Sequence, residues 1–218
     1  GLFIHWGLYA QPARHEWVKS NERIPDEEYT RKYFKRFDPD LYDPNAWADA
    51  ASGAGMKYFV VTTKHHEGFC LWDSKLTDFK APNTTAKRDL LKPMVEAFRK
   101  RNMKVGFYHS LLDWHHPDYT TDQHHPQRDD AARIKADPKR KLERYVAYLH
   151  GQTRELLTRF GKVDILWYDF SVGKTDRFPG KGRKEWQSEK LIKLVRSLQP
   201  NIILNDRLQI DQDLKTPE

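Results

Sequence analysis

The chain has 218 residues, of which 38% are hydrophobic and 32% charged, and its formal net charge is +7. This length suffices for about one domain with a good hydrophobic core. The sequence contains no run of about eighteen apolar residues, which excludes a membrane-spanning helix. Cys70 is the single cysteine, so an intramolecular disulfide is excluded as well. The 7 Trp, 10 Tyr and 11 Phe are a heavy aromatic load for so polar a chain and favour stacking surfaces.

The positive charge raises the possibility of a nucleic-acid partner, but the basic residues are mixed with acidic ones. Lys and Arg gather in Arg99–Lys104, Arg133–Arg144 and Lys181–Lys184. Such mixed runs are typical of a solvated helix face, so we expect the Lys and Arg of Arg133–Arg144 to face solvent. No zinc-finger spacing, RNP-like strand or phosphate-binding Gly loop accompanies them, and we predict no nucleic-acid binding. An anionic substrate is the alternative use of the charge.

Strand and helix patterns alternate along the chain. In chain order, the expected elements are a strand at Leu2–Trp6, an irregular stretch over Leu8–Asn21, helices at Ile24–Phe37 and Asp43–Ala51, a strand at Lys57–Thr63, a helix at Asp89–Asn102, a strand at Lys104–Tyr108, a long helix at about Pro138–Phe160, a strand within Gly161–Phe170, a helix at Trp186–Leu198 and a strand at Asn201–Asn205. The chain opens directly on core-like strand, without an initiator Met or a signal peptide. We therefore expect that this is not the native N-terminus.

The five expected strands are separated by helices and by no hairpin signal, so the sheet should be parallel with right-handed crossovers. A doubly wound sheet and a (β/α)₈ barrel both fit this count. Chemically capable side chains follow every strand: His5 and Trp6; His65 and His66; Tyr108 and His109; Trp167 and Asp169; Asn205, Asp206 and Arg207. A barrel recruits the ends of many strands, whereas a doubly wound sheet concentrates its site at one switch point. This pattern favours a (β/α)₈-like TIM barrel.

The barrel interpretation has a consequence for the domain organisation. A complete barrel usually takes about 250 residues. We therefore expect residues 1–218 to be part of one catalytic barrel domain of about five βα units, with the last strands beyond Glu218. The strand ends should converge on one cleft, and an open apolar seam should lie beside Leu2–Trp6 and Asn201–Asn205.

The strand within Gly161–Phe170 ends in a carboxylate. Side chains alternate along a strand, so Trp167 and Asp169 share one face, with Asp169 at the carboxyl end. A charged group beside a large flat ring suits a sugar, which has polar edges and an apolar C–H face. The alternative is that Asp169 caps the next helix or pairs with an arginine.

Histidines form the second notable pattern, in Lys64-His65-His66-Glu67-Gly68-Phe69 after the clearest strand. The pairs His65–His66, His115–His116 and His124–His125 lack the spacings that set two ring nitrogens on one metal ion. Neutral imidazoles donate from one nitrogen and accept at the other, which suits sugar hydroxyls. Hydrogen bonding to a sugar is the preferred interpretation, a metal site is the competitor, and no cofactor is predicted.

Together these motifs resemble the α-L-fucosidases of glycoside hydrolase family 29 over the whole chain, Leu2 to Glu218. The motifs are Ile4-His5-Trp6-Gly7, Glu16-Trp17, Lys64-His65-His66-Glu67-Gly68-Phe69 with Leu71-Trp72-Asp73-Ser74, Leu166-Trp167-Tyr168-Asp169 and Asn205-Asp206-Arg207. The resemblance implies a (β/α)₈-like catalytic barrel, usually followed by a β-sandwich that is absent here. It implies a metal-free, retaining, exo-acting hydrolase of terminal α-L-fucose on glycoconjugates or polysaccharides, in a secreted, periplasmic or lysosomal protein.

The resemblance also implies roles for individual residues. Asp169 matches the catalytic nucleophile, and Glu218 matches the acid/base position of some members. Positions that line the fucose pocket are matched by His5, Glu16, Trp17, His65, His66, His109, Trp167 and Arg207. The chain departs from the family pattern after the nucleophile, where Phe170 replaces a common Gly, and at Leu208-Gln209, where Trp-Gly often stands. Both departures alter the pocket rim and hence the substrate preference.

Three classes of function follow from these residues. A retaining glycosidase would form a covalent intermediate on Asp169, while a second carboxyl about 5 Å away protonates the leaving oxygen. A metal-dependent barrel hydrolase would need three or four ligands around one point. A non-catalytic fucose-binding barrel is the third class, because Glu218 is the last residue of the chain. Trp167 and Trp17 would form an apolar wall for the methyl group that distinguishes fucose from galactose.

Overall fold

The structure, a computed structural model, describes residues 1–217 and is built around one parallel sheet. The sheet has five strands in the order β1-β2-β3-β4-β5, and all four pairings are parallel. The strands are β1 (Leu2–Ile4), β2 (Tyr58–Lys64), β3 (Lys104–Ser110), β4 (Ile165–Asp169) and β5 (Ile203–Leu204). Because the order never reverses, the sheet winds in one direction, as in a barrel wall, and the doubly wound alternative is excluded.

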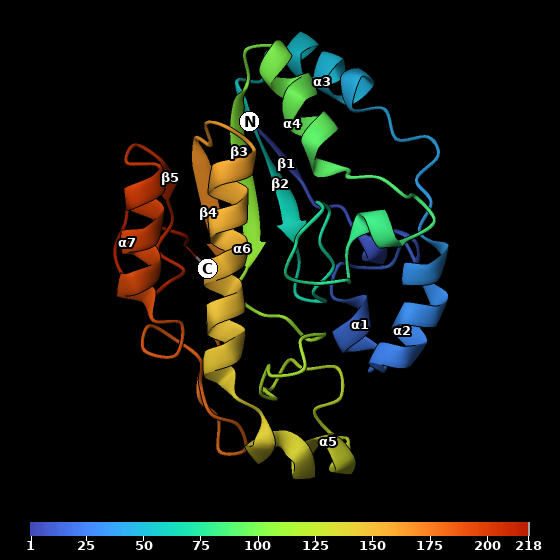
Figure 1. Cartoon of the computed structure of the whole chain (residues 1–218), viewed down its shortest axis with the longest axis vertical. Helices are drawn as coiled ribbons and strands as arrows, with labels where there is room; N and C mark the ends of the chain where they lie inside the picture. The colour runs from blue at the N-terminus through green and yellow to red at the C-terminus, as the bar shows by residue number, and fades with distance from the viewer. Residues whose placement is uncertain (218) are drawn as a thin grey trace.

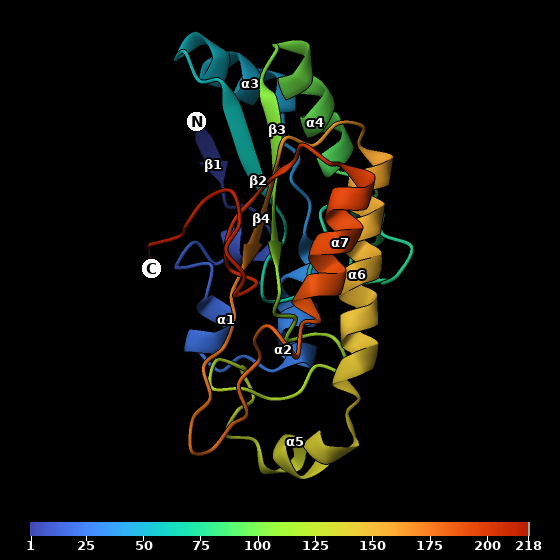
Figure 2. The same ribbon diagram turned by 90° about the vertical axis from the view of Figure 1, so that its left-hand side faces the viewer.

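Helices connect successive strands, and α4, α6 and α7 pack on one side of the sheet. Their bounds are α1 (Val18–Asn21), α2 (Asp26–Lys32), α3 (Pro44–Gly53), α4 (Leu91–Lys100), α5 (Ala131–Ala136), α6 (Leu142–Arg159) and α7 (Ser188–Leu198), with short 3₁₀ helices η1 (Leu8–Ala10), η2 (Phe34–Arg36), η3 (Ala81–Asn83) and η4 (Asp137–Lys139). Figure 1 shows α6 and α7 lying side by side along the strands. Figure 2 shows α4, α6 and α7 on one face of the sheet and the C-terminal loops on the other. This segregation confirms the predicted (β/α)₈-like arrangement.

Local sequence signals explain where two of these helices begin. Oδ1 of Asp43 accepts hydrogen bonds from the backbone N–H groups of Asn45 and Ala46, and Pro44 occupies the first turn of α3. At the start of α4, Oδ1 of Asp89 accepts hydrogen bonds from the backbone N–H groups of Leu91 and Lys92. These carboxylates satisfy donors that have no partner inside a helix. The predicted starts of both helices are therefore correct to within about two residues, the usual uncertainty of a helix end.

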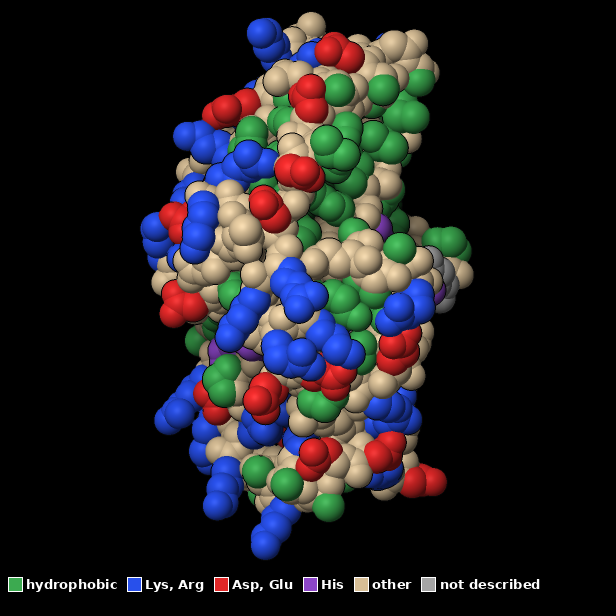
Figure 3. All heavy atoms as spheres, turned by 90° about the vertical axis from the view of Figure 1, so that its right-hand side faces the viewer, with side chains coloured by type: hydrophobic (Ala, Val, Ile, Leu, Met, Phe, Trp, Pro, Cys, Tyr) green, Lys and Arg blue, Asp and Glu red, His purple; other side chains and the backbone are tan. Residues whose placement is uncertain are grey.

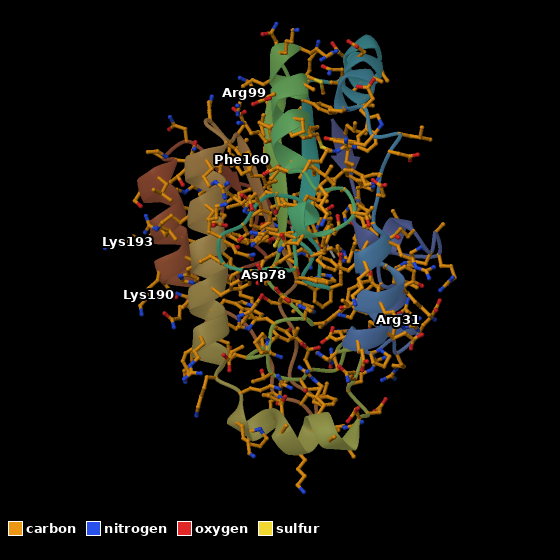
Figure 4. All side chains as sticks on the ribbon, turned by 45° about the vertical axis from the view of Figure 1, so that its right-hand side comes forward. Arg31, Asp78, Arg99, Phe160, Lys190 and Lys193 are labelled. Atoms are coloured by element: carbon orange, nitrogen blue, oxygen red, sulfur yellow. The ribbon has the colours of Figure 1, made fainter. Side chains whose placement is uncertain are left out.

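The end of α6 is fixed from a neighbouring helix. The Arg99 guanidinium, near the end of α4, donates to the carbonyl oxygens of Phe160 at 2.8 Å and Lys162 at 2.6 Å. Figure 4 shows Arg99 lying beside Phe160, whereas Lys190 and Lys193 on α7 point outward. Gly161 follows with a φ of 69°, a left-handed conformation that ends the helix and starts the turn into β4. The contact thus sets where β4, the strand that carries Asp169, enters the sheet.

The hydrophobic core lies between the sheet and the helices, and the two edges of the sheet remain partly open. Every residue of β2 and β3 except the first is buried. On the edge strands, by contrast, Phe3 of β1 is 42% exposed and Ile203 of β5 is 41% exposed. These are exposed apolar side chains on the two edge strands, and the open seam expected there stays a prediction. Within residues 1–217, no helix is long and apolar enough to cross a membrane.

The structure corrects several predicted elements. The stretch expected to be irregular contains η1 and α1, the helix expected at Ile24–Phe37 is divided into α2 and η2, and the long helix expected from about Pro138 begins at Leu142. Helix α5 was not predicted. Its Arg133 is only 9% exposed, because its guanidinium donates to Oγ1 of Thr121 and to the carbonyl of Tyr119. The expectation that every basic residue of Arg133–Arg144 faces solvent is therefore wrong for Arg133.

The surface charge otherwise follows the sequence pattern. Figure 3 shows Lys and Arg side chains interspersed with Asp and Glu over one face of the molecule, around a hydrophobic area in its upper part. Several basic residues are held in exposed ion pairs, such as Arg14–Glu22 and Arg183–Glu189. Exposed pairs of this kind contribute only about 0–1 kcal/mol each to stability. We assign these charges to the solvated surface.

Candidate active site

A cavity opens at the carboxyl ends of the strands. Its volume is about 520 Å³, within the range of small-molecule sites. The ends of β1, β2, β3 and β4 and the segment after β5 all contribute to its wall, which confirms the predicted convergence of the strand ends on one cleft. The lining residues are Phe3, His5, Glu16, Trp17, His65, Tyr108, Trp167, Asp169, Phe170 and Arg207.

Asp169, the last residue of β4, presents its carboxylate to this cavity. The Tyr108 hydroxyl donates to Oδ2 of Asp169 at 2.7 Å, and Nε of Arg207 lies 3.8 Å from Oδ1. Burial, reinforced by the Asp169 charge, raises the pKa of Tyr108 well above its ordinary value, so the phenol remains a proton donor. A donor on one oxygen and a cation near the other orient the carboxylate. The Asp169 side chain is 17% exposed and thus accessible from the cavity.

Three histidines belong to this site: His5 and His65 line the cavity, and His66 lies against Asp169. Although His5 is among the more exposed cavity residues, partial burial and the neighbouring His65 lower its pKa to about 4. His66 is fully buried, and burial followed by the nearby histidines holds its pKa well below the ordinary value. Nε2 of His66 lies 3.8 Å from Oδ2 of Asp169, but at neutral pH this ring is uncharged and the contact is not an ion pair. His5 and His66 are therefore neutral hydrogen-bonding groups at neutral pH.

The tautomer of His66 follows from its partner. The Ser110 hydroxyl donates its proton to the carbonyl of Leu112 and lies 2.6 Å from Nδ1 of His66. Because that proton is already used, Ser110 accepts from Nδ1–H of His66. Nε2 then carries a lone pair and faces Asp169, where it can accept a hydrogen bond from a hydroxyl bound between them.

The loop that carries these histidines is fixed by a buried ion pair. Nζ of Lys64 lies 3.2 Å from Oδ2 of Asp113, and the two side chains are 0% and 2% exposed. Oδ1 of Asp113 accepts the N–H groups of His115 and His116. Gly68 has a φ of 90°, and a Cβ there would lie 2.2 Å from Oδ1 of Asp113. Only glycine allows this close approach, which explains the Lys64–Gly68 spacing.

Arg207 is positioned by the side chain of Asn205. Oδ1 of Asn205 accepts the N–H of Tyr168 at 3.0 Å, and Nδ2 donates to the carbonyl of Tyr168 at 2.8 Å. The amide therefore reproduces a pair of strand hydrogen bonds beyond β5, which is only two residues long. This extension directs the following turn, so that Arg207 reaches Asp169 on the neighbouring strand.

Aromatic rings form two walls of the cavity. The first, which we call the strand wall, consists of Phe3, Tyr108 and Trp167, with ring centroids 6.2 Å apart for Phe3–Tyr108 and 5.6 Å apart for Phe3–Trp167. The second includes Trp17 and Phe170, whose centroids are 5.5 Å apart. The rings of both walls meet edge to face, a favourable geometry for aromatic pairs.

Most of the candidate residues meet at this site. The cavity is lined by His5, Glu16, Trp17, His65, Trp167, Asp169 and Arg207, and His66 lies beneath it against Asp169. His109 is placed elsewhere. It follows Tyr108 on β3 and therefore points to the opposite face, where it contacts Oγ1 of Thr63 and the ring of Trp72. Glu218 lies outside the described residues.

Sequence reasoning named Tyr108 as a strand-end residue but chose its neighbour His109 for the pocket, and it missed Phe3. Tyr108 is opposite Trp167 in the β3–β4 register, so the two side chains share a face. Phe3 precedes His5 by two positions and shares its side of β1 in the same way. Strand alternation and the assumption of adjacent parallel strands would have found both. Within residues 1–217, no group of three or more His, Cys, Asp or Glu is arranged to hold a metal ion.

Comparisons with known proteins agree with this geometry. A family model described as Alpha-L-fucosidase matches residues 1–217. The chain is 30% identical to the tissue alpha-L-fucosidase of Bos taurus over 95% of its own length and 44% of that protein. It is similar to the solved structure of alpha-L-fucosidase isoenzyme 1 from Paenibacillus thiaminolyticus, with a TM-score of 0.87 and 53% identity over 95% of this chain and 48% of that one.

A third comparison concerns a structure with a bound molecule. The alpha-L-fucosidase AlfC from Lactobacillus casei, in complex with alpha-L-fucose product, has a TM-score of 0.81 and 29% identity, covering 95% of this chain and 68% of that one. The chain spans less than half the length of the bovine and Paenibacillus relatives. A family match across residues 1–217, together with these likenesses, shows that the chain belongs to the alpha-L-fucosidase family.

Proposed function

We propose that residues 1–218 are part of the catalytic barrel of a retaining, exo-acting α-L-fucosidase that releases terminal α-L-fucose from glycans. The observation that carries this proposal is Asp169, whose carboxylate faces the cavity between the Tyr108 hydroxyl and the Arg207 guanidinium. A carboxylate held beneath an anomeric carbon can trap the oxocarbenium-like transition state covalently. Family membership and the fucose-bound relative support the choice of sugar.

The reaction would proceed in two balanced steps. In the first, an Asp169 oxygen forms a bond to the anomeric carbon while the bond from that carbon to the leaving oxygen breaks. The general acid gives its proton to the leaving oxygen. In the second step the same group, now a base, takes a proton from water as the water oxygen attacks the anomeric carbon and releases Asp169. We assign the acid/base role to Glu218 from its match to the family pattern.

Neutral histidines and Glu16 would recognise the sugar hydroxyls. His5 and His65 line the cavity with ring centroids 5.5 Å apart, and Glu16 lines the same cavity. Because both rings are neutral at neutral pH, His5 offers one donor and one acceptor, whereas His66, whose Nδ1–H is used by Ser110, offers the acceptor Nε2. Glu16 adds an acceptor. A fucose ring presents both kinds of group on its three free hydroxyls, so this mixed set suits it.

The strand wall would contact the methyl group of fucose. Phe3, Tyr108 and Trp167 present apolar ring surface beside Asp169. A galactoside carries a hydroxymethyl group in place of that methyl. A hydrophobic pocket discriminates between such groups by only about 1–3 kcal/mol, so we expect preference for fucosides to be real but modest.

Azide rescue tests the roles of the two carboxyls. Asp169→Ala and Asp169→Gly should lose activity on all fucosides, because no glycosyl-enzyme can form. Azide should restore turnover by attacking from the vacated face and give β-fucosyl azide. Glu218→Ala should instead keep activity on activated aryl fucosides and give α-fucosyl azide, because azide then enters in the second step. The anomeric configuration is measured by NMR.

The same experiment separates the alternatives. Near wild-type rates for Asp169→Ala would disprove the proposed nucleophile. Normal behaviour of Glu218→Ala alone would place the acid/base at another residue. Fucose binding without turnover by the wild-type protein would indicate a binding barrel. Loss of activity with a chelator and recovery with zinc would favour a metal-dependent hydrolase.

A further inference from the structure

Phe170, directly after Asp169, adopts an unusual backbone conformation. Its φ is 126°, a region that residues with a side chain rarely occupy. Such a conformation persists only where the surroundings hold it, and it is concentrated at functional sites. The ring of Phe170 lines the cavity, which places an aromatic side chain where a glycine would relieve the backbone.

The ring is held by two other aromatic side chains. Trp17, His124 and Phe170, which we call the mouth triad, contact one another with ring centroids 5.3 Å (Trp17–His124), 5.5 Å (Trp17–Phe170) and 5.2 Å (His124–Phe170) apart. All three contacts are edge to face. Each ring is partly buried, and the rings of Trp17 and Phe170 line the cavity, where a ligand can contact them. Three mutually packed rings form a rigid platform, although they come from three separate loops.

A buried ion pair lies behind this platform. Nζ of Lys181 is 3.1 Å from Oδ2 of Asp122, and the two side chains are 1% and 0% exposed. Tyr119 donates its hydroxyl proton to the same oxygen, and Lys181 lies 4.6 Å from the centroid of the Tyr119 ring. Burial alone would raise the pKa of Asp122, but the Lys181 charge and the Tyr119 hydroxyl bring it below its ordinary value. The carboxylate is therefore ionised at neutral pH.

This ion pair joins the two loops that supply His124 and Phe170. Oδ1 of Asp122 accepts the N–H of His124 at 2.8 Å. Lys181 and Val172 exchange two backbone hydrogen bonds, each 2.8 Å long, and Val172 is two residues after Phe170. The Asp122–Lys181 pair thus fixes the loop of His124 to the loop of Phe170 at the point where their rings meet.

Phe170 lies beyond Asp169 along the strand direction. Trp167, in the strand wall, is two residues before Asp169 on the same strand, whereas Phe170 follows the strand end. An exo-acting enzyme encloses the terminal sugar at the deep end, so the group attached to its anomeric oxygen extends towards the mouth. Resting on the proposed function, we propose that Phe170, backed by Trp17 and His124, forms a leaving-group subsite, positioned by the buried Asp122–Lys181 pair.

The chemistry of the subsite indicates what it takes. Aromatic faces pack against the apolar C–H face of a pyranose or against an aryl ring. Polar contacts at the edge are available from Gln123, whose Nε2 lies 3.1 Å from Nε2 of His124. The platform therefore suits a leaving group with one flat apolar face, such as a sugar residue or a phenol, and offers little to a small ion.

Leaving groups of different size test this proposal. The variants are Phe170→Gly and Phe170→Ala, and the matched control is Phe178→Ala in the same loop. Phe178 does not line the cavity and lies 4.9 Å from the Arg177 guanidinium. The substrates are α-L-fucosyl fluoride, an aryl α-L-fucoside and a fucosyl disaccharide. Fluoride is too small to reach the mouth triad, so kcat/KM on the fluoride reports the deep part of the site alone.

We expect both Phe170 variants to lose about three- to tenfold in kcat/KM on the aryl fucoside and the disaccharide. Their kcat/KM on the fluoride should fall by a smaller factor, so that the ratio of kcat/KM on the aryl fucoside to that on the fluoride falls at least about threefold. The control should keep wild-type values on all three substrates. Equal losses on all three substrates, or no loss on any, would overturn the subsite. A wild-type protein inactive on every fucoside, the fluoride included, would overturn the proposed function and the subsite with it.

The role of the Asp122–Lys181 ion pair is tested by comparing kcat/KM on the aryl fucoside with kcat/KM on the fluoride. Lys181→Met should lower the ratio of kcat/KM values for aryl fucoside and fluoride as Phe170→Ala does, and Lys181→Arg should restore it in part. Because Lys181→Met leaves Asp122 buried without its cation, the double variant Asp122→Asn/Lys181→Met serves if the single variant fails to fold. An unchanged ratio in a folded variant would show that the pair does not position the subsite.

Discussion

The two walls of the cavity are built in different ways. The strand wall (Phe3, Tyr108 and Trp167) stands on β1, β3 and β4, where the parallel ladder determines which side chains share a face. The mouth triad stands on loops and depends on a buried ion pair and a strained backbone at Phe170. The apolar wall beside Asp169 is thus fixed by the sheet, whereas the rings of the mouth triad are held by contacts between loops. Substitutions should therefore separate into two classes.

The largest expected effect is on the support of the mouth triad. Lys181→Met leaves a buried carboxylate unpaired, which should lower the free energy of unfolding by about 3–5 kcal/mol. Thermal and urea unfolding measure this change. The matched control is Arg183→Met, which breaks the exposed Arg183–Glu189 pair. This variant should lower the free energy of unfolding by at most about 1 kcal/mol. Similar losses in both variants would show that the Asp122–Lys181 pair is no more important than a surface pair.

The next effect concerns the strand wall. Tyr108→Phe keeps the ring but removes the hydrogen bond to Asp169, a bond to a charged group worth about 1.5–3 kcal/mol. We expect kcat/KM to fall roughly 10- to 150-fold on fucosyl fluoride and on aryl fucosides alike. Steady-state kinetics on both substrates provide the measurement. A loss confined to the aryl fucoside would place Tyr108 on the leaving-group side and remove the distinction between the two walls.

A smaller effect concerns backbone strain at the mouth. Glycine normally destabilises a site relative to alanine, but at a φ of 126° the order should reverse. We expect Phe170→Gly to be more stable than Phe170→Ala by about 1 kcal/mol in urea unfolding. Phe178 has no positive φ, so Phe178→Ala should be at least as stable as Phe178→Gly. If alanine is the better residue at both positions, the strain at Phe170 does not exist in solution.

The smallest expected effect is a pH dependence of stability that arises from His5. The pKa of His5 is lowered from 6.5 to about 4, so between these values the unfolded chain binds the proton more readily than the folded chain. Stability should therefore fall as the pH is lowered from 6.5 to 4 and change no further through this group below 4. His5→Asn should remove part of this slope in urea unfolding series. An identical slope in both proteins would contradict the shift.

The sequence was sufficient for features that depend on local periodicity. Alternation along one strand correctly placed Trp167 and Asp169 on a common face. The same rule explains why the sequence analysis selected His109 as a pocket residue, whereas the cavity is lined by its neighbour Tyr108. A position one residue along a strand points to the opposite face, and the residue type alone did not decide between an imidazole and a phenol. The register of β3 against β4 is not evident from the sequence. It places Tyr108 opposite Trp167 and therefore on the cavity side of the sheet.

Features that depend on long-range pairing could not be predicted. Lys181 and Asp122 are 59 positions apart, and nothing in either neighbourhood distinguishes them from the many solvated charges of this chain. Arg133 was assigned to solvent for the same reason, whereas its buried partners come from the loop before α5. The backbone of Phe170 is a further case, because the conformation is imposed by packing against Trp17 and His124.

The sequential order of the sheet also affects how the chain folds. Every strand pairs with the strand that precedes or follows it in the sequence, so each pairing closes a loop of limited length and the contact order stays moderate for a parallel sheet. Folding can then advance along the chain during synthesis, one βα unit docking on the last. The cavity takes residues from the first strand and from the turn after the fifth. The catalytic groups would therefore meet only when the last of these units has docked, and a nascent chain would remain inactive until then.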